Sequence, residues 1–116
     1  MADIEIIGCE SGGYRPALHF GAWRIAFLTF AQRFSDITYL ERHKNTDEAF
    51  VLLKGSAKIY IGEEMECYVM EPNKIYNVKR GVWHNIKVSC DALVLIVENA
   101  DTSKENSEYM DVTNYS

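Results

Sequence analysis

The sequence has few cysteines, no long apolar run and no basic cluster, and each absence excludes a class of protein. Its three cysteines are an odd number, and no two have the C-x2-C spacing of a metal site, so we expect reduced thiols in a cytoplasmic protein. No stretch approaches the roughly 18 apolar residues of a membrane-spanning helix. The N-terminal MADIEIIGCE is acidic and lacks the apolar core of a signal peptide. We therefore expect no membrane partner.

Positive charges are too few and too scattered to form a nucleic-acid-binding surface. The chain has 12 Lys and Arg against 17 Asp and Glu, which gives a net charge of −5, and the longest basic cluster is Lys79-Arg80. A protein that binds nucleic acid must neutralise phosphates, so we expect no such partner. Apolar residues make up 47% of the 116 residues, which excludes disorder and suits one domain that buries roughly 65% of its unfolded surface.

Short segments of strand length, separated by turn residues, follow one another along most of the chain. They are rich in branched and aromatic residues or alternate between apolar and polar ones, and no helical periodicity precedes residue 100. We predict strands within residues 23–30, 37–43, 49–53, 56–61, 65–70, 75–78, 83–88 and 92–97. This pattern predicts an all-β antiparallel sandwich or barrel.

The two ends of the chain are less regular. Residues 3–7 alternate briefly and are a candidate edge strand, whereas residues 14–21 are expected to form an ordered arm without regular structure. Residues 101–116 are polar and acidic, and Thr102-x-x-Glu105 resembles a capping box that favours one short helical turn. We divide the chain into a β-barrel with an N-terminal arm, residues 1–100, and a C-terminal tail, residues 101–116.

An acid–histidine–acid group is the clearest functional signal in the sequence. Glu41 and His43 are two residues apart, so they point to the same face of an extended strand. A short polar loop, residues 44–47, can return Glu48 to the same place, and His84 can reach it from a later strand. Imidazoles and carboxylates that converge from separate strands form a pocket for a divalent metal.

The remaining aromatic and histidine side chains have ordinary structural interpretations. Most of the aromatics, Tyr14 among them, are expected in the core, and Trp83 is the one that we place at a pocket wall. His19 has no partner in the sequence and is interpreted as structural. Cys67 lies in an alternating segment and is expected to be a small core or face residue.

The candidate ligands resemble the two sequence motifs of the cupin superfamily. The first motif, H-x-H-x(3,4)-E-x(6)-G, corresponds here to Glu41-x-His43-x(4)-Glu48-x(6)-Gly55. The second, P-x-G-x(2)-H-x(3)-N, corresponds to Lys79-x-Gly81-x(2)-His84-x(3)-Val88. Three of the four positions that usually bind metal in the family keep their residue type, and Glu41 replaces the first histidine. Lys79 and Val88 replace the proline and the asparagine.

The resemblance implies a single-domain, double-stranded β-helix (jelly-roll) barrel that holds a divalent transition metal, Mn, Fe, Zn or Ni, through His43, Glu48, His84 and Glu41. The sequence leaves the role of Glu41 open between a fourth ligand, a general base and an exposed strand charge. As a ligand it would help to cancel the charge of the ion and lower its Lewis acidity. Without it, two histidines and one carboxylate leave positions open for water and substrate.

Three classes of function remain compatible with these residues. The ligand spacing favours a metal-dependent enzyme of isomerase, lyase or dioxygenase type that acts on a polar small molecule. The departures at Glu41, Lys79 and Val88 favour instead a non-catalytic module that binds a sugar or carboxylic acid, with or without metal. Small cupins are commonly dimers, so the resemblance also implies a homodimer that uses a sheet face. No residue specifies the reaction.

Overall fold

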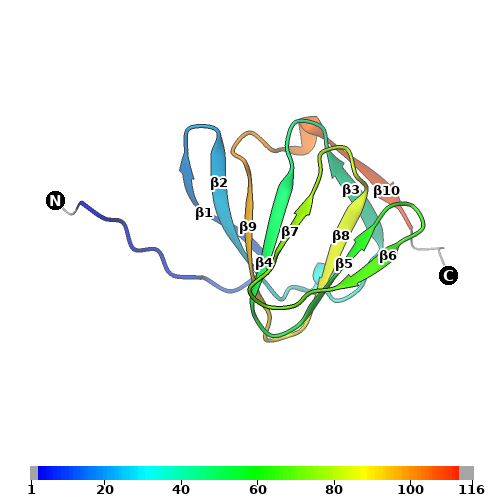
Figure 1. The fold of residues 1–116 in the computed structure, drawn as a ribbon, viewed down its shortest axis with the longest axis horizontal. Helices are drawn as coiled ribbons and strands as arrows, with labels where there is room; N and C mark the ends of the chain where they lie inside the picture. Colours follow the sequence, from blue (N-terminus) through cyan, green and yellow to red (C-terminus); the bar gives the residue numbers. More distant parts are fainter. Residues whose placement is uncertain (1–2, 113–116) are drawn as a thin grey trace.

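Ten β-strands and two short 3-10 helices make up the described part, residues 3–112, of the computed structural model (Figure 1). The elements are β1 (Tyr14–Phe20), β2 (Trp23–Thr29), η1 (Gln32–Phe34), β3 (Tyr39–His43), β4 (Glu48–Lys54), β5 (Ala57–Ile61), β6 (Glu66–Val69), β7 (Ile75–Val78), β8 (His84–Val88), β9 (Leu93–Asn99), η2 (Lys104–Asn106) and β10 (Ser107–Asp111).

The strands form two antiparallel sheets that face each other across the core. Sheet A has the order β1-β2-β9-β4-β7, and sheet B has the order β10-β3-β8-β5-β6. Non-consecutive strands are neighbours in both sheets, which is the connectivity of a jelly roll. The predicted all-β, double-stranded β-helix architecture is therefore confirmed.

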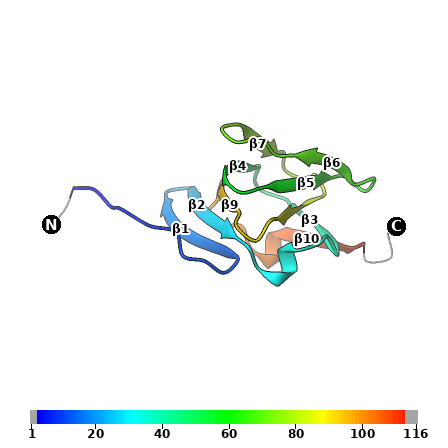
Figure 2. The same cartoon turned by 90° about the horizontal axis from the view of Figure 1, so that it is seen from below.

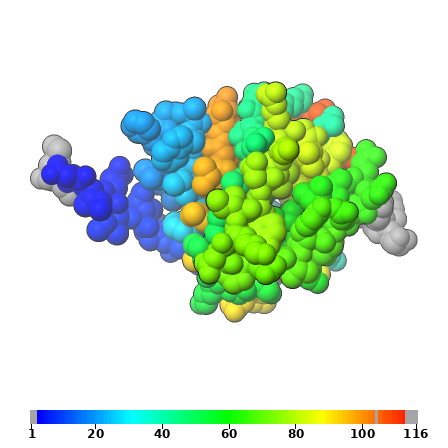
Figure 3. All heavy atoms as spheres, viewed as in Figure 1, coloured from blue at the N-terminus to red at the C-terminus, as the bar shows by residue number. Residues whose placement is uncertain are grey.

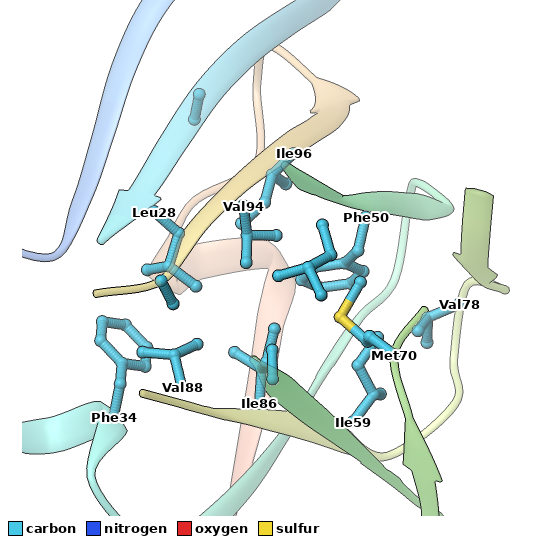
Figure 4. Close-up of a cluster of buried hydrophobic side chains, with 14 residues drawn as sticks. Leu28, Phe34, Phe50, Ile59, Met70, Val78, Ile86, Val88, Val94 and Ile96 are labelled. Carbon is cyan, nitrogen blue, oxygen red and sulfur yellow. The ribbon is translucent and has the colours of Figure 1, made fainter. Parts of the chain in front are cut away.

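Alternate residues of each strand point into the space between the sheets and form one apolar core. Leu28, Phe50 and Val94 enter it from sheet A, and Ile59 and Ile86 enter it from sheet B (Figure 4). The regular alternation fixes the pairing, because a slip of one residue would turn every side chain to the other face. The same alternation decides which polar residues point inward at the open end of the core.

The sequence located the middle strands well and the ends of the chain poorly. The eight predicted segments correspond to β2 to β9, with boundaries that differ by one or two residues. Residues 3–7 form no strand, so that prediction was wrong. Residues 14–20 are strand β1, not an irregular arm, because they pair with β2 along their length from Tyr14↔Leu28 to Phe20↔Trp23. A bulge between Pro16 and Leu18 accommodates the proline at this sheet edge.

The segment predicted to be a polar tail contributes to sheet B. Strand β10 pairs with β3 from Ser107↔His43 to Asp111↔Tyr39. The short 3-10 helix η2 precedes it, with a capping box between Ser103 and Asn106, one residue later than the box predicted from the sequence. The last part of the predicted tail, residues 113–116, lies outside the described residues.

The glycine of the first motif fixes the turn after β4. Gly55 has φ of +74°, and a Cβ atom built on it would lie 2.7 Å from the Cα of Ala92. Another residue type would meet both an unfavourable backbone conformation and a steric clash with this backbone. This turn lets β4 pair closely with β9 and so positions Glu48 at the other end of β4.

An extended arm, residues 3–12, precedes β1 and runs away from the barrel on the side of β1 and β2 (Figures 1 and 2). It is anchored at its end, where the Gly12 amide donates a hydrogen bond to Thr29 Oγ1 over 2.8 Å and the Thr29 amide donates to the Gly13 carbonyl. Within residues 3–112, no helix has the length and apolar character needed to cross a membrane.

Candidate metal centre

The structure brings together all four residues that the sequence predicted as a site. Glu41 and His43 lie on β3, His84 begins β8, and Glu48 begins β4 of the opposite sheet. One possible ligand atom from each residue lies within 4.8 Å of the other three. Glu41 and His84 are directly opposed in the β3–β8 pairing. The four side chains therefore converge from both sheets.

Neighbouring groups orient both imidazoles toward the centre of the cluster. His43 Nδ1 lies 2.8 Å from Ser107 Oγ on β10, and His84 Nδ1 lies 2.9 Å from the Val82 carbonyl oxygen. The two residues are 7% and 2% exposed, so rotation of their rings is restricted by packing. Hydrogen bonds of this kind fix the ring orientation of histidines that bind a metal through Nε2.

Both Nε2 atoms approach the same oxygen of Glu48. Glu48 Oε1 lies 3.1 Å from His43 Nε2 and 2.8 Å from His84 Nε2. Two ligands that each lie about 2.1 Å from a metal are roughly 3.0–3.4 Å apart. The distances from Glu48 Oε1 to the two Nε2 atoms are thus close to those between neighbouring ligands of one ion.

The hydrogen bonds of His84 show why this cluster needs a positive charge. Its Nδ1 faces a carbonyl oxygen and must donate, whereas its Nε2 faces an oxygen of the Glu48 carboxylate. A neutral imidazole carries a single N–H, so both contacts require either the imidazolium or a cation between Nε2 and the carboxylate. The donor set present therefore fits a divalent metal.

The charges of the cluster depend strongly on one another. Burial alone would raise the pKa of Glu48, but hydrogen bonds and charge from His43 and His84 outweigh it and lower the pKa to about 2. Burial alone would lower the pKa of both imidazoles, but the Glu48 carboxylate raises it above its ordinary value. The Glu48 carboxylate and the protonated forms of the two rings therefore stabilise each other.

Glu41 faces the cluster and is not an exposed strand charge. Its side chain is 24% exposed, and its Oε2 lies 3.9 Å from His43 Nε2. Burial, followed by the charge of Glu48, raises the pKa of Glu41. Its position suits a fourth ligand, and it equally suits a base beside an ion held by the other three.

A cavity of about 230 Å³ adjoins the cluster, and a second polar group lies in its wall. The hydroxyl of Tyr14 donates a hydrogen bond to Glu98 Oε2. Arg24 donates from Nε to the Tyr14 hydroxyl over 3.1 Å and from Nη2 to Glu98 Oε2 over 3.2 Å. Arg24 and Glu98 are opposed in the β2–β9 pairing. On the other side of β9, the Ala49↔Val97 pair aligns β4 so that Glu48 lies beside Glu98.

This Tyr14–Glu98–Arg24 group holds a proton in a poorly solvated place. Burial, followed by the hydrogen bond to Glu98, raises the pKa of the Tyr14 hydroxyl. Burial, followed by the charge of Glu48, raises the pKa of Glu98. Sequence reasoning missed all three residues, because they are far apart in the chain and belong to no motif. The available signal was the charged pair of Arg24 and Glu98 inside otherwise apolar strands.

One other expectation about a single residue was wrong. Trp83 does not line this cavity, because its ring packs against the guanidinium of Arg42, 4.4 Å away. The aromatic ring beside His84 is that of Phe50, with 6.1 Å between ring centroids. Cys67 is exposed on the edge strand β6, so of the two predicted alternatives it is a face residue and not a core residue.

Comparisons with known proteins identify the fold. No family model matches the sequence, and no curated protein matches it. An RmlC-like cupin from Methanocaldococcus jannaschii with a double-stranded β-helix fold matches 85% of this chain and 93% of its own, with 11% identity and a TM-score of 0.66. A cupin-2 domain protein from Shewanella frigidimarina matches 79% of this chain and 84% of its own, with 15% identity and a TM-score of 0.63.

A third solved structure covers nearly the whole chain. Streptomyces PAC13, solved as a single-residue variant with uridine, matches 96% of this chain and 93% of its own, with 6% identity and a TM-score of 0.70. Identities this low establish a shared fold and no shared activity.

Proposed function

We propose that this chain, which has the cupin fold, binds a divalent transition metal through His43, Glu48, His84 and Glu41 and presents it to a polar small molecule in the adjoining cavity. The observation that carries the proposal is the convergence of two oriented Nε2 atoms on one buried carboxylate oxygen, within 3.1 Å. A buried carboxylate between two imidazoles is costly unless a charge compensates it. A divalent ion supplies that charge at neutral pH.

The ligand set narrows the choice of metal. Two imidazoles and two carboxylates are borderline and hard ligands, which suit Mn, Fe, Zn or Ni better than soft ions. Two carboxylates also cancel the charge of a divalent ion. When bound, such a metal polarises a carbonyl or hydroxyl oxygen.

The free, exposed thiols of Cys9, Cys67 and Cys90 support a reducing, cytoplasmic location for the protein.

The second polar group of the cavity supports proton transfer. The Tyr14 hydroxyl donates a hydrogen bond to Glu98, and Arg24 donates to the oxygens of both. A molecule in the cavity would contact this group on one side and the metal-binding residues on the other, because both line the same space. Positioned acid–base groups are what isomerisation and elimination require, so we favour an isomerase or lyase among the enzymatic alternatives.

Metal content and metal affinity test the proposal. Protein without a histidine tag is stripped with chelator, reloaded, and analysed by mass spectrometry of elements and by calorimetry with Mn²⁺, Zn²⁺ and Ni²⁺. We expect one ion per chain for the wild type and at least a tenfold lower affinity for H84Q and E48Q. The control H19Q changes the third histidine, which is exposed on β1, and should bind like wild type. Less than a tenth of an ion per chain after reloading would refute metal binding.

A metal-free binding module is the second candidate, and one observation favours it. No buried side-chain nitrogen or oxygen among the described residues lacks a hydrogen-bond partner, so the cluster is satisfied without an ion. In that case a sugar or carboxylic acid should raise the melting temperature equally in chelator and in metal. The metal proposal instead expects stabilisation by such compounds only after metal is added.

A further inference from the structure

A second cavity, of about 280 Å³, lies between the two sheets. Ile59 and Ile61 of β5 line it from sheet B, and Tyr76 and Val78 of β7 line it from sheet A. It shares no lining residue with the cavity beside the metal-binding residues. The second cavity is therefore a separate candidate binding site, and the proposed function does not use it.

The second cavity lies where the two sheets end. Strands β6 and β7 are the last strands of their sheets and lie along the same edge of the sandwich (Figure 2). Figure 3 shows atoms of both strands, green to yellow-green, on the surface. Tyr68 of β6 is paired with the core residue Ile59, so its side chain points to the inner side of the sheet. Ile59 is 1% exposed whereas Tyr68 is 44% exposed, so the inner side of the sandwich is open to water here.

The two cavities differ in charge. Three carboxylates, those of Glu41, Glu48 and Glu98, line the first cavity. Among residues 3–112, Lys79 is the one charged side chain that lines the second. This part of the chain contains no ion pair of Lys79. The second cavity thus combines apolar walls with one available cation.

The acid that the charge of Lys79 reaches is already engaged by other groups. Lys79 helps to lower the pKa of Asp47, after larger effects from the hydrogen bonds that Asp47 accepts. Those hydrogen bonds come from the Asn77 side chain and from the Arg80 amide. The Lys79 ammonium group can therefore pair with an anion in the second cavity.

We propose that the second cavity binds an amphipathic carboxylate, whose apolar body lies between the sheets and whose carboxylate pairs with Lys79. The cavity is about twice the size of the roughly 150 Å³ cavity that holds benzene, which suits a chain or ring of roughly ten non-hydrogen atoms. Such a body would remove apolar surface of the Tyr68 ring from water. Lys79 stands where the second motif of the family has proline, and the proposal gives this departure a role.

The walls of the second cavity are held in place without a ligand. The Tyr76 hydroxyl accepts a hydrogen bond from the Glu71 amide over 2.9 Å, and the Tyr68 hydroxyl donates one to Glu66. Ile59 belongs to the packed core. A cavity that is formed in advance costs little ordering when a ligand enters.

Octanoate, which has about the required size, is the probe. It is titrated into ¹⁵N-labelled protein in chelator, so that no metal occupies the first cavity, and binding is followed by two-dimensional NMR. We expect a dissociation constant below about 1 mM, with the largest amide shifts at Ile61, Tyr68 and Val78. No shift at about ten times that concentration would overturn the proposal. Shifts centred on Tyr14 and Glu98 would place octanoate in the first cavity and would equally overturn it.

Two variants test the wall and the charge separately. Y68A removes an exposed wall of the cavity and should weaken octanoate binding at least tenfold. K79Q removes the cation and should weaken octanoate binding about threefold, as expected for a partly exposed ion pair, while the affinity for 1-octanol stays unchanged. The matched controls are Y60A and K58Q on β5, which lie between the inward positions of that strand, and both should bind octanoate like wild type.

Circular dichroism of each variant shows that the fold is kept, which the exposure of Tyr68 and Lys79 favours. A folded Y68A variant that binds octanoate as tightly as wild type would overturn the assigned cavity. Equal octanoate affinity of K79Q and wild type would overturn the pairing with Lys79. Metal affinity of the same variants should match wild type, so failure here is distinguishable from failure of the proposed metal centre.

Discussion

Glu48 Oε1 and His84 Nε2 lie 2.8 Å apart although the two residues are 36 positions apart and belong to different sheets. The contact joins sheet A to sheet B at the end of the barrel that holds the cavity. His43 adds a second contact to the same oxygen. These contacts connect the stability of the barrel to the charge state of the candidate metal centre.

Replacement of Glu48 by glutamine should destabilise the metal-free protein by about 2–3 kcal/mol. The amide keeps the shape of the side chain but loses the charge that the two imidazoles compensate, and hydrogen bonds to charged groups contribute about 1.5–3 kcal/mol. Urea unfolding in chelator measures the effect. The control E64Q changes a carboxylate at an exposed turn and should shift the free energy of unfolding by less than about 0.5 kcal/mol. Equal stability of E48Q and wild type would contradict the buried cluster.

The free energy of unfolding of the metal-free protein should fall as pH rises from 6 to 9. The pKa values of His43 and His84 lie above the ordinary 6.5, so their contribution is complete below pH 6.5 and is lost as they deprotonate in the folded state. The raised pKa of Glu41 acts in the same direction. Glu48, whose pKa is lowered to about 2, contributes above its ordinary 4.5 and loses that contribution toward pH 2.

Urea titrations at several pH values, in chelator and in saturating metal, check this dependence. In saturating metal the free energy of unfolding should instead rise with pH above pH 6, because protons compete with the ion for both imidazoles. The variant H84Q should show a weaker dependence than wild type in chelator. Stability that rises between pH 6 and 9 in chelator would contradict the assigned charges.

Replacement of Tyr14 by phenylalanine should cost about 1–2 kcal/mol and leave metal affinity unchanged. The change removes a hydrogen bond to the buried Glu98 carboxylate, and a buried polar group that loses a partner is destabilised by about that amount. The matched control is Y68F, because Tyr68 also donates to a glutamate, Glu66, but at an exposed site. Urea unfolding and calorimetry with Zn²⁺ measure the two effects. A tenfold loss of metal affinity in Y14F would contradict the expectation that the Tyr14–Glu98–Arg24 group does not contribute to metal binding.

Replacement of Gly55 by alanine should destabilise the protein by about 2–4 kcal/mol. Its positive φ and the 2.7 Å distance from a new Cβ to the Cα of Ala92 combine backbone strain with a clash. Gly62 provides the comparison, since its φ is +77° but no atom lies within 4 Å of a new Cβ. G62A should therefore cost about 1–2 kcal/mol. Thermal and urea unfolding of both variants measure the difference, and equal losses would show that the clash at Gly55 is relieved.

The sequence predicted the parts of the site whose geometry is local. Glu41 and His43 share a face because strand residues alternate, and the motif spacing placed Glu48 and His84 beside them. The barrel itself followed from turn residues between short strands. The shared face of Glu41 and His43 and the turns depend on neighbours along the chain, which a sequence displays directly. Glu48 and His84 are distant from each other in the chain, and the resemblance to the family motifs placed them.

Residues that depend on long-range pairing were not predictable in the same way. Tyr14 and Glu98 meet only because β1 and β9 both lie beside β2. Strand β10 has no apolar alternation, since it is an edge strand whose partner is β3. Its Ser107, which orients His43, therefore looked like part of a polar tail. The two motif positions that do not match the family, Lys79 and Val88, did not indicate that these residues contribute to the site.

Anomalous X-ray diffraction from crystals of metal-loaded protein tests the central claim most directly. Data collected on both sides of the absorption edge of the added metal locate the ion without assumptions about its ligands. We expect one anomalous peak per chain, about 2.0–2.2 Å from His43 Nε2, His84 Nε2 and a Glu48 carboxylate oxygen. A fully loaded crystal with its peak elsewhere, or with no peak between these three side chains, would contradict the metal centre.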